Sequence, residues 1–216
     1  MSLLDLITGN AGNQVAQRAE NKFGISKNQI IALLAVAAPV IISYLKNKTK
    51  DKAEAESLSN ALDKDHDGSI LNDLSQIDAR EQEGSSILDH IFGSQKTQVE
   101  NQLSQNTGIS MDKIAPILSM LAPVIMGYIG NQKQTNHVNS GGIGDLLGGI
   151  LGQAQQQAQG GNNPLSDILG QVIGSSSQTS SSNPLEDLLG GVLGTNSKEQ
   201  NKGGLGGLLG SILGKG

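Results

Sequence analysis

The chain has 216 residues, a formal net charge of −5 and no cysteine. Without cysteine, disulfide bonds and thiol chemistry are excluded, and the acidic balance argues against nucleic acid as a partner, because affinity for nucleic acid comes largely from neutralising phosphates. Two Phe and two Tyr are the only aromatic residues, so a folded core must be built from aliphatic side chains.

A long apolar stretch occurs twice in the first 135 residues, at an offset of 84. Residues 24–45 read GISKNQIIALLAVAAPVIISYL, and residues 108–129 read GISMDKIAPILSMLAPVIMGYI. The match extends without a gap over about residues 3–47 and 87–131. Apolar residues in each copy recur at spacings of three and four, which indicates helices, and a repeated unit of this size packs against its own duplicate. We therefore predict an all-α fold in which residues 1–135 form a duplicated helical domain.

Both copies carry the same start signal and the same interruption. Ser26 and Ser110 precede the apolar runs and are suited to cap the helix N-termini. Pro39 and Pro123 remove a backbone donor and crowd the preceding turn. We therefore expect each long helix to kink or break at its Ala–Pro step.

The apolar runs could also be read as membrane spans. Residues 30–45 and 114–129 each form a run of 16 residues, whereas a bilayer span needs about 20. Both runs also contain a proline. We interpret them as two core helices that face each other, because the apolar surface nearly encircles each one.

The connector between the copies, about residues 50–83, holds half of the acidic residues of the chain. It contains the sequence DKDHDGSILNDL at residues 63–74, in which acidic residues alternate before Gly68. This spacing is typical of the first two-thirds of an EF-hand-type loop, and oxygen ligands of this kind favour Ca²⁺. The sequence thus predicts a calcium site with these ligands: Asp63, Asp65, Asp67, the main-chain carbonyl of Ser69, and Asp73.

The end of this loop departs from the EF-hand pattern. The closing position, normally a bidentate Glu, is Leu74, and Asp73 comes one residue early. The alternative is an Asp-rich helix terminus, in which the carboxylates act as caps and complement the helix dipole. We expect His66 to point to solvent, as this loop position normally does.

From residue 136 to 216 the chain changes character, with 20 of its 29 glycines, a Gln tract at 153–159 and a Ser tract at 175–182. These features predict a flexible tail. Four short apolar stripes with helical spacing run through it. The stripes are Ile143, Leu146, Leu147, Ile150 and Leu151; Leu165, Ile168, Leu169, Val172 and Ile173; Leu185, Leu188, Leu189, Val192 and Leu193; and Leu205, Leu208, Leu209, Ile212 and Leu213.

Each stripe is about ten residues long and contains glycine, which costs about 1 kcal/mol per residue in a helix, so none is expected to be a stable helix alone. The stripes therefore need a surface. That surface is a groove on the helical domain or the same segment of another molecule. A lipid interface is less favoured, because interfacial helices usually carry a cationic face and these stripes do not.

The LLD-I-G opening, the duplicated GIS…APVI…Y helices and the LDKDHDGSILNDL connector together resemble the uncharacterised bacterial YidB-like family of domains of unknown function. The resemblance covers about residues 1–135. It implies an all-helical fold and a bacterial source. It carries over no catalytic residue, because it brings no assigned activity.

Function is predicted mainly by what the sequence lacks. It has three histidines in three different segments, no nucleophile motif and no phosphate-binding glycine loop. We expect a non-enzymatic helical interaction or scaffold protein that binds calcium and associates with a protein partner or with itself through its tail. The alternative is a membrane-surface or envelope-associated protein. No secretory signal is recognised, so the default location is the cytoplasm, with export by another route left open.

Overall fold

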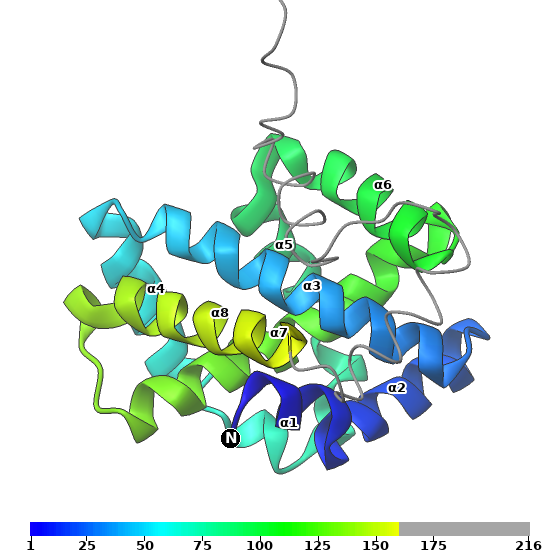
Figure 1. Ribbon diagram of the computed structural model, residues 1–216, viewed down its shortest axis with the longest axis horizontal. Coiled ribbons are helices and arrows are strands. Elements are labelled where there is room, and N and C mark those ends of the chain that lie inside the picture. Colours follow the sequence, from blue (N-terminus) through cyan, green and yellow to red (C-terminus); the bar gives the residue numbers. More distant parts are fainter. Residues whose placement is uncertain (160–216) are drawn as a thin grey trace, which may run out of the picture.

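The computed structural model describes residues 1–159, and over this range the chain is all-α, as predicted from the sequence (Figure 1). The α-helices are α1 (Leu3–Thr8), α2 (Asn10–Phe23), α3 (Lys27–Lys48), α4 (Lys52–Lys64), α5 (Glu81–Phe92), α6 (Lys96–Thr107), α7 (Met111–Thr135) and α8 (Ile143–Gln159). Short 3₁₀ turns are η1 (Ser69–Leu71), η2 (Leu74–Gln76), η3 (Asp78–Arg80), η4 (Gly93–Gln95) and η5 (Ser140–Gly142).

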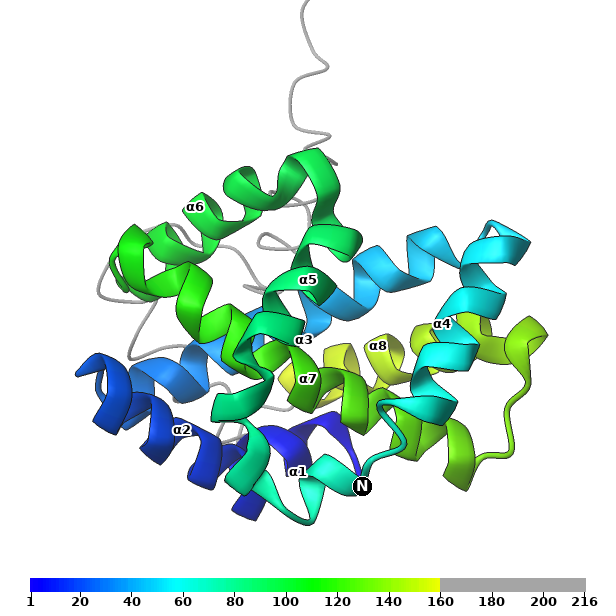
Figure 2. The same ribbon diagram turned by 180° about the vertical axis from the view of Figure 1, so that it is seen from behind.

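The two long helices α3 and α7 form the centre of the fold, and the other helices surround them (Figures 1 and 2). Residues 30–42 of α3 and 117–130 of α7 are buried without interruption. A helix that is apolar on all sides must be covered on all sides, which explains why six shorter helices are spread around these two. The core is aliphatic, with Tyr128 the largest fully buried side chain.

The helix bounds repeat at the offset of 84 seen in the sequence. α2 ends at Phe23 and α3 begins at Lys27. Their counterparts 84 positions later, Thr107 and Met111, end α6 and begin α7. Gly24 and Gly108 close the preceding helices in the left-handed conformation, with φ of 67° and 69°. Ser26 and Ser110 are the N-cap residues of the long helices, although only the Ser26 hydroxyl accepts a backbone N–H, from Gln29.

Of the predicted kink or break at the prolines, the break is wrong: α3 continues through Pro39 and α7 through Pro123. Pro123 has no N–H for the carbonyl one turn earlier, which belongs to Ser119. Gly84 of α5 lies against that carbonyl, so closely that a Cβ added to Gly84 would be 1.7 Å from the oxygen. α5 therefore packs closely on α7 at the turn where the proline leaves a carbonyl oxygen without a helix donor.

Two glycines on α7 position the connector. A Cβ on Gly127 would meet the Ile70 side chain at 2.4 Å, and a Cβ on Gly130 would meet the main-chain oxygen of His66 at 1.7 Å. The equivalent residues of the first copy are Ser43 and Lys46. Because only the second copy has glycine at both positions, the connector can pack this closely only against α7.

The helical fold continues past residue 135, which differs from the predicted domain boundary. α8 packs against α3, and Ile143 and Leu147 are completely buried there. The first of the four stripes therefore belongs to the core, because α3 supplies the surface that a short glycine-containing helix needs. The other three stripes lie outside the described residues.

α3 and α7 are also long and apolar enough to cross a membrane, if judged by length and composition alone. The sequence-based argument from a 16-residue run is thus superseded, since the helices have 22 and 25 residues. Burial distinguishes core helices from membrane spans here, since 78% and 83% of the most apolar windows of α3 and α7 are buried inside the fold. This burial supports their interpretation as core helices.

Candidate functional site

The acidic residues of the connector do not converge as a calcium loop. Asp63 forms an ion pair with Lys133 of α7. Asp67 accepts the backbone N–H of Ser69 at 2.9 Å, and Asp73 accepts that of Ser75 at 3.0 Å. The hydroxyl and then the backbone N–H of Ser69 and Ser75 lower the pKa of the Asp67 and Asp73 carboxyl groups, respectively.

The remaining loop positions also have structural roles. Asp65 ends α4, and its main-chain oxygen accepts a hydrogen bond from Arg80 at 3.0 Å. Ser69 begins η1, and Leu74, at the closing position of the loop, is buried in the core. Within residues 1–159, no group of three or more acidic or histidine side chains lies close enough to hold a metal ion. In residues 1–159 the predicted ligands are thus not gathered into one cluster. Asp67 and Asp73 accept backbone N–H groups as caps do, which was the alternative from the sequence, whereas the ion pair of Asp63 was not predicted.

Exchange of Asp63 for Asn tests the ion pair with Lys133 and, with calcium present, the predicted role of Asp63 as a metal ligand. The Lys133 side chain is only 8% exposed, whereas that of Asp63 is 49% exposed, so we expect the change to lower the free energy of unfolding by about 1–2 kcal/mol. Combining it with Lys133→Met should recover part of the loss, because no buried charge is then left unpaired. Urea denaturation measures the free energy of unfolding of the parent, of Asp63→Asn and of the double variant.

The same titrations with calcium test the metal site. A site with a Kd of about 10 μM would add about 2.7 kcal/mol of stability at about 1 mM Ca²⁺. We expect the denaturation midpoint to stay unchanged. A calcium-dependent rise in the denaturation midpoint of the parent protein that is absent from Asp63→Asn would instead support the predicted calcium site.

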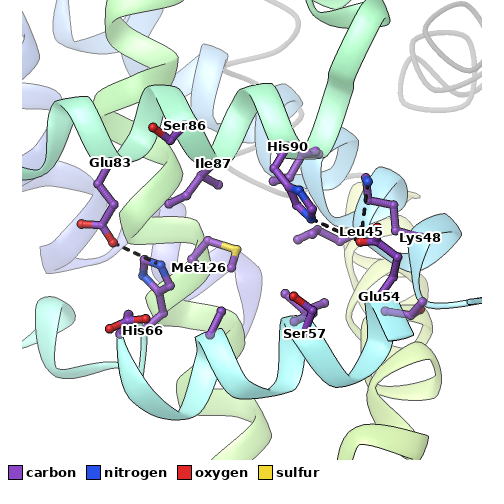
Figure 3. A pocket seen from close by; sticks show the side chains of 15 residues that line it. Leu45, Lys48, Glu54, Ser57, His66, Glu83, Ser86, Ile87, His90 and Met126 are labelled. Atoms are coloured by element: carbon purple, nitrogen blue, oxygen red, sulfur yellow. Dashed lines mark ion pairs between the residues drawn. The ribbon is translucent and has the colours of Figure 1, made fainter. Parts of the chain in front are cut away.

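A pocket of about 310 Å³ lies between α4 and α5 (Figure 3). Its apolar lining comes from four helices, with Leu45 on α3, Leu58 on α4, Ile87 on α5 and Met126 on α7. Each end of the pocket carries a histidine beside a glutamate. We call the end with His66 and Glu83 the inner end, and the end with His90 and Glu54 the outer end.

His66 at the inner end is 5% exposed. Its Nε2 lies 3.3 Å from a carboxylate oxygen of Glu83, and its Nδ1 is buried without a hydrogen-bond partner. Burial lowers the pKa of His66, although Glu83 acts in the opposite direction. Nε2 is the ring nitrogen placed to donate to the Glu83 carboxylate, which leaves Nδ1 as the acceptor when the ring is neutral.

The outer end is more open to solvent. Nε2 of His90 and Nζ of Lys48 lie 3.2 Å and 3.7 Å from the same carboxylate oxygen of Glu54. The His90 side chain is 60% exposed. These groups form a solvated rim, where ion pairs contribute little to stability.

The expectation that His66 points to solvent was wrong. Its main chain lies against Gly130, and its imidazole lies at the pocket beside Glu83 (Figure 3). The EF-hand pattern misplaced this side chain because it describes only the loop and not the helix on which the loop packs. The glycines at 127 and 130, which break the match to the first copy, were the available signal.

Two serines also line the pocket. Ser57 and Ser86 line it, but the Ser86 hydroxyl donates to the carbonyl of Gln82. No hydrogen bond joins a serine to a histidine in the part of the chain that the structure describes. What the pocket presents is an apolar lining with a histidine and a glutamate at each end.

Models of protein families were compared with the sequence. A family model described as a bacterial protein of unknown function (DUF937) matches residues 5–132. The chain belongs to this family. At this level the finding agrees with the resemblance seen in the sequence, and it assigns the protein to bacteria without an activity. No curated protein and no solved structure matches the chain.

The matched range covers the helical fold unevenly. All residues that line the pocket lie within it, whereas α8 and residues 160–216 lie beyond its end. The pocket is therefore built entirely from the part of this protein that matches the family. The stripes belong to the part of the chain that follows.

Proposed function

We propose that this member of the family is a non-enzymatic interaction protein that associates with other copies of itself through the stripes of its tail. The observation that carries the proposal is α8. It contains the first stripe, and it buries Ile143, Leu147 and Ile150 against the helical domain. A segment of this composition thus forms a helix when an apolar surface covers it.

The three later stripes reproduce the features by which α8 packs. Their apolar residues have the same spacing, and the position of Gly148 is glycine in each, at Gly170, Gly190 and Gly210. In α8 that glycine faces Lys46, whose Nζ would be 3.2 Å from an added Cβ. A helix formed by any of these stripes would carry glycine at the position that Gly148 has in α8.

The energetics favour association of several stripes together. Full burial of one Leu or Ile side chain contributes about 1.5–3 kcal/mol. Ordering a ten-residue segment into a helix offsets much of this gain, so association through a single pair of stripes is weak. Three stripes on one chain bind as a linked set, which raises the overall affinity without a new kind of contact. α8 is held in place by a short link, residues 136–142, so the first stripe stays with its own domain.

A triple variant tests the proposal in the full-length chain. Leu169→Ser, Leu189→Ser and Leu209→Ser together remove the central residue of each later stripe. We expect the parent to sediment as concentration-dependent oligomers and the triple variant to sediment as a monomer with an unchanged melting temperature. A matched control replaces three serines of the 175–182 tract with alanine and should behave as the parent.

Two results would contradict the proposal. The parent and the triple variant could have the same sedimentation coefficient at all concentrations, so that the stripes do not mediate association. Alternatively, the parent but not the triple variant could float with liposomes while both remain monomeric. That outcome would assign the stripes to a lipid surface.

A further inference from the structure

α8 lies on a surface of the helical domain that is made mainly by α3 (Figure 1). We call this surface the α8 seat and define it by the two residues that meet the backbone of α8, Lys46 and Thr49. A Cβ added to Gly144 would lie 3.2 Å from Oγ1 of Thr49, and one added to Gly148 would lie 3.2 Å from Nζ of Lys46. Both distances are tighter than an ordinary contact, so the seat favours glycine at these two positions of the helix.

The start of α8 adds two further requirements. Asn139 is the N-cap of η5, and its side-chain oxygen accepts the backbone N–H of Gly142 at 3.1 Å. A Cβ added to Gly142 would lie 3.1 Å from a methyl carbon of Val138. A segment that enters the seat as α8 does therefore carries an asparagine, followed three residues later by a glycine.

Residues 201–214 repeat residues 139–152 closely. The two segments read NKGGLGGLLGSILG and NSGGIGDLLGGILG, and ten of the fourteen positions are identical. The identical positions include all four that the seat and the start of the helix require, at Asn201, Gly204, Gly206 and Gly210.

The positions that differ between the two segments are compatible with the same seat. Asp145 and Gly149 of α8 are exposed, so a different residue at these positions loses no packing contact. Ile143 is completely buried and is replaced by leucine, an exchange between aliphatic side chains that cores tolerate. Ser140 is replaced by lysine, whose long side chain can reach solvent.

The second and third stripes match these features only in part. Both have proline in place of Gly142, and proline has no N–H to donate to an asparagine side chain. In place of Gly144 they have Ser166 and Glu186. Among the later stripes, the fourth is therefore the one that fits the α8 seat.

We propose that residues 201–214 of one copy bind the α8 seat of a second copy in exchange for its α8. This inference rests on the proposed self-association and names the surface that the tail binds. Exchange between such similar segments costs little, because the incoming segment regains the contacts that α8 loses. Each copy has one seat and one such segment, so the contact continues from copy to copy and gives oligomers that grow with concentration.

The link of residues 136–142 sets the conditions for this exchange. It gives α8 a high effective concentration at its own seat, so α8 fills the seat in a dilute protein. The fourth stripe of a second copy competes better at high protein concentration, or when α8 is held less tightly.

Single cysteines test the contact, because the full-length chain has no cysteine of its own. A Thr49→Cys protein and a Gly206→Cys protein are mixed at high concentration and oxidised with diamide. Gly206 is the equivalent of Gly144, whose added Cβ would lie 3.2 Å from Oγ1 of Thr49, so docking in the seat brings the two sulfurs together. We expect a disulfide between the two proteins, identified by mass spectrometry after digestion. It can form only between copies.

Three further variants control this experiment. Ser211→Cys lies in the same segment but is equivalent to the exposed Gly149, and with Thr49→Cys it should form the mixed disulfide at least about tenfold more slowly. Leu147→Ala, added to the Thr49→Cys protein, loosens α8 and should speed cross-linking to Gly206→Cys by about tenfold or more. A single chain with Thr49→Cys and Gly144→Cys should form its disulfide as a monomer. Thermal melting checks that each variant is folded.

The proposal is overturned if Thr49→Cys cross-links to neither Gly206→Cys nor Ser211→Cys, or to both at the same rate. It is also overturned if a chain that carries both Thr49→Cys and Gly206→Cys forms its disulfide only within itself, because the stripe then binds its own domain. Sedimentation of the parent separates these failures from a failure of self-association. Oligomers without the mixed disulfide would retain the proposed function and remove only the α8 seat as its surface, whereas a monomeric parent would contradict both.

Discussion

Exchange of Gly84 for alanine is expected to destabilise the protein by about 2–3 kcal/mol, against the usual preference of a helix for alanine. The new Cβ would lie 1.7 Å from the carbonyl oxygen of Ser119 and 3.0 Å from Cδ of Pro123. Both contacts involve rigid groups of α7, so α5 must move away from the core. Urea denaturation followed by circular dichroism measures the loss.

Gly149 supplies the matched control for this substitution. It lies on the exposed face of α8, and an added Cβ would meet nothing within 4 Å. Gly149→Ala is therefore expected to stabilise the protein by up to about 1 kcal/mol, the ordinary helix-propensity effect. If both substitutions stabilise the protein, the close approach of α5 to the Ser119 carbonyl is incorrect.

Local pattern predicted the helices but not how they meet. The spacing of apolar residues in the two copies was sufficient for an all-α fold, because a helix covered on all sides has a distinct composition. The close packing at Pro123 could not be read from the same pattern, since it involves Gly84, a residue 39 positions earlier in the chain. Proline was interpreted as a kink or a break, whereas α7 continues through Pro123.

The connector shows the same limit at the candidate site. Asp63 matched a calcium ligand by spacing, but its partner is Lys133, which is 70 residues away. His66 matched a solvent-facing position, but Gly130 brings its main chain onto α7. In both cases, a motif defined within twelve residues lacks the long-range partner that decides the role of the side chain. The pocket could not be found from the sequence for this reason.

Among the four stripes, the sequence offered no reason to single out the first, yet Leu147 lies at zero exposure in the core. Leu147→Ala is expected to lower the free energy of unfolding by about 3 kcal/mol, because it leaves a cavity between α8 and α3. Thermal and urea denaturation of the full-length chain measure the change. The result decides whether α8 is part of the folding unit or a dispensable addition to it.

The same substitution in the second stripe, Leu169→Ala, is the matched control, because it has the same chemistry at the equivalent position. We expect it to change the stability of the helical domain by less than about 0.5 kcal/mol. Equal losses from the two substitutions would mean that the second stripe also packs into the core. A loss from neither would mean that α8 adds little to the fold. The expected contrast instead follows from position, because residues 136–142 are a short link between α7 and the first stripe, whereas the second stripe begins only after α8.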